Sequence, residues 1–268
     1  MVAFKGLIKL TLAAATVFTL AQTAMADTLA DIKARGRVLI AIDLGAPPYG
    51  MLDGSAKPSG SDVEAAQALA KDLGVELEIV PVTGPNRVPF LLTGKADIVM
   101  ASFSITDERK KVIDYSAPYG VVPTVIGGPA GEAVADFAAL SGKTVAVTRG
   151  TTSDAALTKG AKAASGVEIV RYEDDATTNT AISTGQQDYI AAAASVIKQV
   201  NIANPSRNVE VKFVMTTAPY AIGLRQGETE LKAWLNQWVA TNISSGNLNT
   251  IYEKHFGIPL PAEYQAKK

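Results

Sequence analysis

Residues 101–109 have the sequence ASFSITDER and connect a short apolar strand to the first turn of a helix. Residues 98–101 are apolar, as in a buried strand, and Thr106 stands where a helix N-cap would, ahead of a helical segment at 107–113. The unpaired N–H groups and partial positive charge of a helix N-terminus favour a carboxylate. Arg109 can add a planar, two-pronged contact. The stretch therefore predicts half of an anion site, unless it is an ordinary capped surface helix.

The same strand-to-helix arrangement recurs along the chain. Helical segments separate strands predicted at four places: 38–42, 75–79, 143–148 and 167–170. This alternation indicates a parallel, layered α/β sheet. A second hydroxyl-rich turn, RGTTS, follows at 149–153, and Thr-Gly-x-x-Asp occurs at 93–97 and again at 184–188. The recurrence favours two similar α/β lobes, whose ligand sites would face one another at the carboxyl ends of their strands.

The first 26 residues have the features of a secretory signal peptide. Two lysines precede an apolar run at 10–21, and the sequence AMA at 24–26 matches an A-x-A cleavage site after Ala26. The apolar run is too short for a permanent span, and no later segment approaches the roughly 20 apolar residues that a span needs. We expect an exported protein that starts near Asp27; an uncleaved anchor is the alternative.

Composition narrows the classes of function. The chain has 25 basic and 26 acidic residues, no cysteine and a single histidine, His255. This balance gives no basic patch for nucleic acid. The absence of cysteine excludes thiolate zinc sites, and one histidine argues against a histidine-based metal site or a Ser-His-Asp hydrolase. We therefore expect no metal, no cofactor and no nucleic-acid partner.

Short motifs follow one another along the chain in a fixed order. They are GRVLI at 36–40, Asp43 with PYG at 48–50, GSDVE at 60–64, RVPFLLTGKAD at 87–97, SITDER at 104–109, DYSAPY at 114–119, VTRGTT at 147–152 and IYEKHFG at 251–257. In this order they resemble the family 3 extracellular solute-binding proteins, the receptors of bacterial polar amino-acid ABC importers. The resemblance covers residues 29–256.

This resemblance implies a two-lobed α/β fold of the type II periplasmic-binding-protein kind, with two hinge crossovers and the ligand in the interlobe cleft. The crossovers are expected near 120–124 and 217–224. Lobe one would comprise residues 27–121 and 218–268, and lobe two residues 122–217.

The resemblance also implies a carboxylate site. In such proteins the ligand's α-carboxylate is held by the residues matching Arg109, Ser104 and Thr152 with its neighbouring backbone. The acid matching Asp43 helps to bind the side chain or the ammonium group, and neighbouring residues add polar contacts. The implied ligand-binding residues are Asp43, Ala101, Ser102, Ser104, Arg109, Thr151 and Thr152.

The chain departs from the family pattern in lobe two. The acid that usually accepts the α-ammonium falls at Ala193, counted from Asp188, and two usual aromatic positions fall at Ala46 and Gly84. Because a buried, unpaired ammonium costs several kcal/mol, the ligand lacks an α-ammonium, another acid accepts it, or the alignment is shifted by a residue or two. Arg87 matches a family residue that we interpret as structural. The candidate acids are Asp43, Asp154 and Asp174.

Together these observations predict an exported, non-enzymatic receptor for a small carboxylate-bearing solute, an amino acid or related organic acid. We expect a periplasmic monomer that closes on its ligand and delivers it to an ABC permease in the inner membrane. Two alternatives are a periplasmic cyclohexadienyl-type dehydratase, which would need an acid in the cleft, and a sensory receptor.

Overall fold

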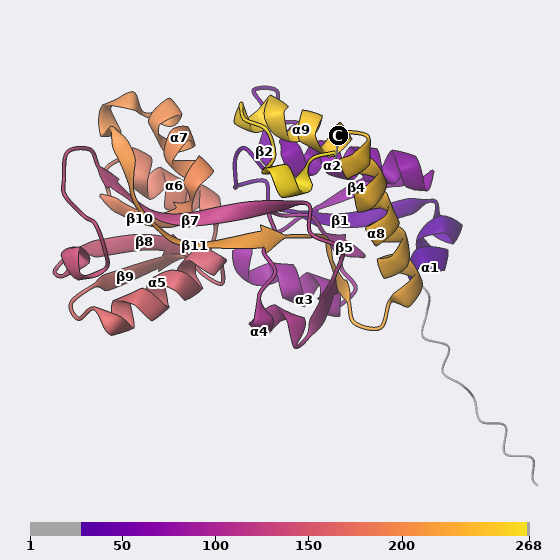
Figure 1. The fold of residues 1–268 in the computed structure, drawn as a ribbon, viewed down its shortest axis with the longest axis horizontal. Helices are drawn as coiled ribbons and strands as arrows, with labels where there is room; N and C mark the ends of the chain where they lie inside the picture. Colours follow the sequence, from indigo (N-terminus) through magenta and orange to yellow (C-terminus); the bar gives the residue numbers. More distant parts are fainter. Residues whose placement is uncertain (1–27, 267–268) are drawn as a thin grey trace, which may run out of the picture.

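Residues 28–266, the part of the chain that the computed structural model describes, form two α/β lobes (Figure 1). Each lobe is built on a five-stranded sheet, so the predicted two-lobed architecture is confirmed. The predicted signal peptide at 1–26 lies outside the described residues. Among the helices that are described, none has the length and apolar character needed to cross a membrane.

The first lobe takes its sheet from the N-terminal half of the chain and from one late strand. Its strands are β1 (Arg37–Ile42), β2 (Met51–Leu52), β3 (Pro58–Ser59), β4 (Glu76–Pro81), β5 (Ile98–Val99), β6 (Ile113–Tyr115) and β12 (Gly223–Arg225). Its helices are α1 (Thr28–Arg35), α2 (Ser61–Leu73), α3 (Arg87–Leu92), α4 (Asp107–Lys110), α8 (Thr229–Ser244) and α9 (Asn247–Phe256). The main sheet has the order β4-β1-β5-β12-β6.

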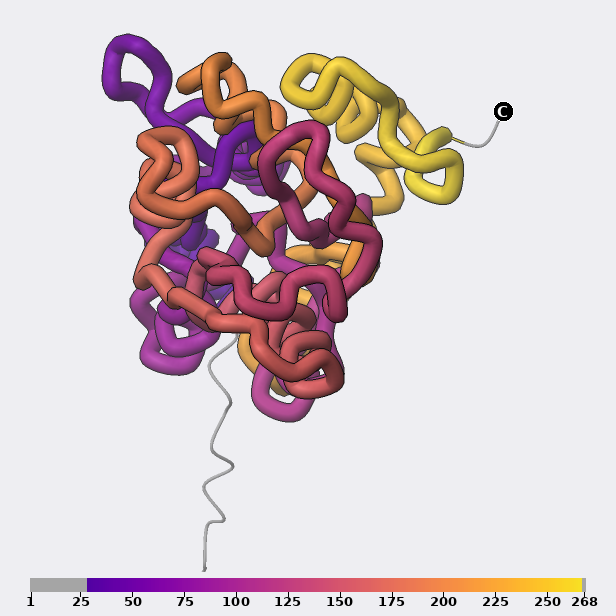
Figure 2. The backbone as a smooth tube through the Cα atoms, turned by 90° about the vertical axis from the view of Figure 1, so that its left-hand side faces the viewer, coloured from indigo at the N-terminus to yellow at the C-terminus, as the bar shows by residue number. Residues whose placement is uncertain are grey.

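Alternation along β1 divides the core of the first lobe into two layers. Ile40 and Ile42 belong to a cluster with buried residues of α2, α8 and α9, whereas Ala41 points into a second cluster with Leu91 and Phe103. Successive side chains of a strand point to opposite faces of the sheet, so neighbouring residues of β1 enter different layers of the core. Figure 2, which looks onto the second lobe, shows the C-terminal segment (yellow) beside that lobe and not across it.

The second lobe is built from the middle of the chain. Its strands are β7 (Gly120–Pro129), β8 (Thr144–Thr148), β9 (Glu168–Tyr172), β10 (Tyr189–Ala193) and β11 (Val209–Tyr220), in the order β11-β7-β10-β8-β9. Its helices are α5 (Thr152–Ala163), α6 (Asp175–Ser183) and α7 (Ala194–Ala203). Valine and isoleucine side chains from both faces of the sheet are buried against these helices.

Two long strands connect the lobes. β7 and β11 pair antiparallel from Gly120 opposite Tyr220 to Pro129 opposite Val209, and Figure 1 shows both running from one lobe into the other. The expected crossovers at 120–124 and 217–224 fall at the first-lobe end of this pair. The exact lobe boundaries stay a prediction.

Two local expectations were wrong. The sheets are mixed, because β12 and β7 run antiparallel to their neighbours where the chain passes between the lobes. The helix after Thr106 ends at Lys110, and Ile113 already belongs to β6. The motif GSDVE at 60–64 begins α2: Ser61 is the first helical residue, and the capping position is Gly60, whose φ of 120° suits glycine. Glycine there leaves no side chain to cap the helix.

Candidate functional site

A small cavity lies between the two lobes, where the chain leaves β5 and β8. Its volume is about 50 Å³. The first lobe contributes Ala46, Tyr49, Arg87 and Ser102, and the strands β7, β8 and β10 with their helices contribute Val122, Thr124, Thr148, Thr151, Thr152, Ser153, Asp175, Ala191, Ala192, Ala193 and Val196. The two predicted hydroxyl-rich turns therefore meet at one site.

Arg109 lies at the outer side of this boundary. Thr106 caps α4 by accepting a hydrogen bond from the Arg109 backbone N–H at 3.2 Å, as the sequence predicts. The guanidinium lies over the Phe103 ring, 4.5 Å from its centroid, and donates to the Ser104 carbonyl at 2.9 Å. Its other nitrogen donates at 3.2 Å to the carbonyl of Gly150 in the second lobe. Burial, together with the nearby Arg87, lowers the pKa of Arg109 to about 10, so the group stays charged at neutral pH.

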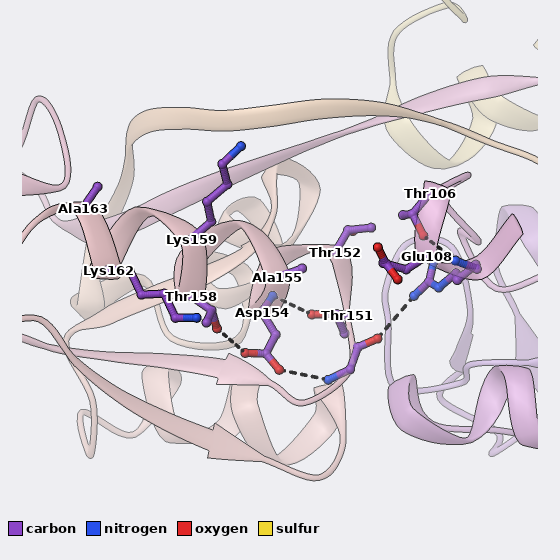
Figure 3. A pocket seen from close by; sticks show the side chains of 12 residues that line it. Thr106, Glu108, Thr151, Thr152, Asp154, Ala155, Thr158, Lys159, Lys162 and Ala163 are labelled. Atoms are coloured by element: carbon purple, nitrogen blue, oxygen red, sulfur yellow. Dashed lines mark hydrogen bonds between the residues drawn. The ribbon is translucent and has the colours of Figure 1, made fainter. Parts of the chain in front are cut away.

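A larger cavity of about 880 Å³ lies on this outer side, and Figure 3 shows the side chains that line it. Thr151 and Thr152 line both cavities, so the N-terminus of α5 separates the inner space from the outer one. Lys159 and Lys162, on the next turns of α5, line the outer cavity with Arg109. The acids Glu108 and Asp154 line the same cavity, so its charged lining is of both signs.

Ser102 occupies a strained turn at the wall of the inner cavity. Its φ is 43°, a left-handed value that is uncommon outside glycine. The backbone N–H donates at 2.7 Å to Oδ2 of Asp62, which is only 2% exposed. Burial raises the pKa of Asp62 to about 7, and the bond from Ser102 opposes this shift. The sequence motif at 60–64 gave Asp62 no individual role; the structure makes it the anchor of the Ser102 turn.

Arg87 is 5% exposed and lines the cavity, although it was interpreted as structural. Its guanidinium donates to the Ala101 carbonyl at 3.0 Å and to the Gly84 carbonyl at 3.2 Å. Ala101 therefore supports Arg87 through its backbone. Arg87 anchors these two carbonyls and also lines the cavity with its charged side chain. A sequence pattern could not distinguish these two roles.

The predicted lobe-two residues hold the start of α5. The Thr151 hydroxyl accepts from the Asp154 N–H at 3.1 Å and donates to the Thr148 carbonyl at 2.8 Å. Thr151 is thus the N-cap, and Thr152 is the first residue of the helix. Within residues 28–266 the Thr152 hydroxyl makes no hydrogen bond, so it is available to a ligand.

Asp43 is the predicted acid of the first lobe and is 4% exposed. Its Oδ1 accepts from the Gly45 N–H at 3.0 Å, but the buried Oδ2 has no hydrogen-bond partner in the described part of the chain. Burial and then the facing carboxylate of Asp175 raise the pKa of Asp43 to about 7, against a smaller opposite effect of Arg87. Asp175 is held by the Thr148 hydroxyl at 2.6 Å. Asp175 was not among the acids considered from sequence.

The two other candidate acids have structural partners. Asp154 accepts from Arg171 Nε at 2.8 Å and from the Gly150 N–H at 3.1 Å. Asp174 caps α6 by accepting from the Thr177 N–H at 2.6 Å. Ala193, by contrast, does line the cavity, as the alignment expects of its position.

The lobes are in close contact around the cavity. Asn179 donates to the Gly45 carbonyl at 3.4 Å. A Cβ placed on Gly84 would lie 2.9 Å from the Arg149 carbonyl oxygen, which is closer than side-chain carbons approach. Gly84 stands where relatives were expected to carry an aromatic ring, so its lack of a side chain permits this closed arrangement. In the same described region, no group of three or more acidic or histidine residues could hold a metal.

Comparisons with known proteins agree on the type of molecule. The sequence matches the family described as "Bacterial extracellular solute-binding proteins, family 3" over residues 38–258. It is 30% identical to the L-cystine-binding protein of Escherichia coli (strain K12) over 233 residues, which is 84% of this chain and 85% of that one.

Solved structures agree as well. The solute receptor for L-cysteine of Neisseria gonorrhoeae superposes with a TM-score of 0.80 at 29% identity, covering 90% of this chain and 99% of the receptor. An ancestral amino acid-binding protein, described as a precursor of cyclohexadienyl dehydratase, gives a TM-score of 0.78 at 32% identity, with coverages of 85% and 99%. The two-lobed solute-binding fold is thereby established.

Proposed function

Because the chain belongs to the bacterial extracellular solute-binding proteins of family 3, we propose that it is the exported receptor of an ABC importer for a small carboxylate-bearing solute. The solute is an amino acid or a related organic acid; the relatives are named for the amino acids L-cystine and L-cysteine. In this proposal the protein is a non-enzymatic, periplasmic monomer without a cofactor that delivers its ligand to an inner-membrane permease.

The observation that carries the proposal is the inner cavity. Arg87 borders it, Arg109 lies at its outer boundary, and the N-terminus of α5 with the Thr152 hydroxyl borders it from the second lobe. A carboxylate at this position would receive charge-assisted hydrogen bonds from a lobe-one guanidinium and backbone N–H groups from a twelve-residue helix. Ser102 and Ser104 complete the proposed lobe-one side of the site, together with Ala101 and Asp43.

A hinge motion explains how such a receptor loads. The cavity is enclosed by the lobes, so the ligand must enter when they separate about β7 and β11. On closure Arg109 reaches the second lobe through Gly150, and the same contact seals the ligand from solvent. A permease that recognises the faces beside the cleft can then distinguish loaded from empty receptor, because only their closed arrangement brings both faces into register.

The rival function is a dehydratase, favoured by one solved neighbour's relation to cyclohexadienyl dehydratase and by the pKa of Asp43 near 7, which suits proton transfer. The relatives argue against it, since those compared are described as solute-binding proteins and solute receptors. Incubation with prephenate or arogenate tests this alternative, and sustained product formation would refute the receptor proposal.

A thermal-shift screen of the mature protein against amino acids and organic acids tests the receptor proposal directly. A ligand at 100 times its Kd stabilises the folded state by about 2.7 kcal/mol. For a chain of this size we expect a rise in Tm of roughly 5–10 °C. If no compound of either class raises the Tm, the proposed solute class is wrong.

A further inference from the structure

A further cavity between the lobes lies behind the connecting strand β7, and its volume is about 270 Å³. Val122 and Thr124 of β7 line the inner cavity, whereas Pro123 lines this one. Because successive side chains of a strand point to opposite faces, the two cavities lie on opposite sides of β7. Tyr49 is the one lining residue that they share. This hinge-side cavity is therefore a separate space from the proposed solute site.

The first lobe gives the hinge-side cavity an aromatic wall. The Tyr252 and Phe256 rings of α9 are stacked, with their centroids 4.0 Å apart and their planes at 6°. The Tyr49 ring packs edge-on against Phe256 at 4.9 Å. Ile258, which follows α9, is 59% exposed and extends the apolar surface. This wall favours a flat apolar group, because aromatic rings pack well against one another by their faces and edges.

The second lobe places hydrogen-bond donors opposite this wall. The ten-residue α7 begins at the cavity, and its N-cap, Ala193, makes no side-chain hydrogen bond. The Ser195 Oγ is buried and has no hydrogen-bond partner among residues 28–266. Of the two basic residues in the lining, His255 contacts Glu64 at 2.9 Å, whereas Lys198 has no ion-pair partner in the described part of the chain. Uncapped N–H groups, a free hydroxyl and an ammonium together favour the oxygen atoms of an anion.

The size of the cavity and its two walls together indicate one class of ligand. About 270 Å³ is near the lower limit of roughly 300 Å³ for small-molecule sites, which leaves room for a single ring. A ring fits against α9, and a carboxylate fits the donors of α7. A cation would be repelled by Lys198, and an anion without a ring would leave the aromatic wall uncovered.

The position of the cavity connects its occupancy to lobe closure. Its walls come from α9 of the first lobe and α7 of the second, and Figure 1 shows both helices above the connecting strands. Rotation about β7 and β11 that brings the lobes together around the inner cavity moves them apart on the opposite side of these strands. Opening must therefore narrow the hinge-side cavity. A molecule that fills this cavity in the closed arrangement opposes opening.

We propose that the hinge-side cavity binds a monocyclic aromatic carboxylate and thereby holds the lobes closed, which raises the affinity of the receptor for its solute. The binding site itself does not depend on the proposed receptor function; its effect on solute affinity does. Because such coupling is reciprocal, the solute raises the affinity for the aromatic acid by the same factor.

The test uses 4-fluorophenylacetate as the probe, with binding measured by fluorine NMR and calorimetry. Lys198→Gln should weaken probe binding about tenfold, because it removes the charge that faces the carboxylate. Lys71→Gln is the matched control: this exposed lysine of α2 lines neither the inner nor the hinge-side cavity, and its loss should change probe affinity by less than twofold. The neutral 2-(4-fluorophenyl)ethanol should bind more weakly than the acid to the wild type, and equally to the wild type and Lys198→Gln.

Two results would overturn the site and leave the receptor function standing. One is the absence of probe binding to the wild type, and the other is an unchanged probe affinity in Lys198→Gln.

A competition experiment separates the hinge-side cavity from the inner one. Protein saturated with the solute found by thermal shift should still bind the probe, about three- to tenfold more tightly than the empty protein does. Displacement of the probe by the solute would place both in the inner cavity and overturn the second site. Equal probe affinity with and without solute would refute the effect on closure. If no solute is found, the receptor proposal fails, and the loss of probe binding in Lys198→Gln still tests the cavity.

Discussion

The turns that follow β5 and β8 have similar sequences but different supports. After β5, α4 is only four residues long, and the turn depends on charged side chains: Arg109 reaches across the boundary, and buried Asp62 holds the strained Ser102. After β8, the twelve-residue α5 begins directly at the site, and the turn presents hydroxyl and backbone N–H groups without a charged side chain at the cavity. The first-lobe turn therefore contributes formal charge, and the second-lobe turn contributes a helix N-terminus.

This difference changes the reading of the opening sequence motif. A helix N-terminus attracts anions when several turns of peptide dipoles are aligned, and α4 has a single turn. The anion-binding capacity of residues 101–109 consequently rests on Arg109 and not on the helix that it belongs to. In the second lobe, the anion-binding capacity rests on the N-terminus of the twelve-residue α5 and not on a charged side chain of the turn.

The largest expected effect comes from removing the charge of the first lobe. Arg109→Ala should weaken ligand binding at least 100-fold, because it removes a charge-assisted bidentate partner and the contact with Gly150 together. Calorimetric titration with the ligand found by thermal shift measures it. Arg149→Ala is the matched control: this arginine of the second turn forms an exposed pair with Glu173 and should change affinity by less than twofold. Thr152→Ala should weaken ligand binding only about tenfold. An equal loss of affinity in Arg109→Ala and Thr152→Ala would contradict the division of roles between the two turns.

The buried acid behind the first turn should make stability fall with pH. The folded-state pKa of Asp62, about 7, lies above its ordinary value of 3.8, so the folded protein binds a proton that the unfolded chain releases. The free energy of unfolding should therefore decrease as pH rises from about 4 to about 7, by on the order of 3 kcal/mol for this group. The raised pKa of Asp43 likewise makes the free energy of unfolding decrease as pH rises.

Asp62→Asn isolates this contribution. Its carbonyl can still accept the Ser102 N–H, so the variant can keep this hydrogen bond while it loses the titrating group. Urea unfolding at pH 4.5 and pH 8 should show a clearly smaller loss of stability in the variant than in the wild type. An identical loss would mean that Asp62 does not titrate in this range and that the Ser102 turn has another anchor.

How far the sequence predicts this molecule depends on the range of the interaction. Local signals were sufficient for the caps: Thr106 and its position relative to Arg109 identified the N-cap, and the apolar runs located β1, β5 and β8. The recurrence of strand and helix was sufficient for two lobes. The extent of α4 was not predictable, because the return of the chain into β6 overrides the helical pattern after Lys110.

The membership of the site was harder to predict than the fold. Arg87 and Asp175 come to the cavity through tertiary contacts between elements that are distant in sequence, and neither stands in a motif that signals a ligand contact. Asp174 and Asp175 are adjacent, and only the start of α6 decides that the first caps the helix and the second faces Asp43. A one-residue difference of this kind is below the resolution of pattern reasoning.

The smallest expected effect concerns the two N-caps, and it tests whether helix length matters as the comparison requires. Thr106 and Thr151 each accept a hydrogen bond from the third residue after them, at 3.2 and 3.1 Å. Thr151→Ala should lower the free energy of unfolding by about 1 kcal/mol, because it uncaps a twelve-residue helix. Thr106→Ala should cost about half as much, since α4 has one turn and its position is fixed by Arg109. Chemical denaturation without ligand measures both, and a larger loss at Thr106 would show that α4 supports the first turn more than its length suggests.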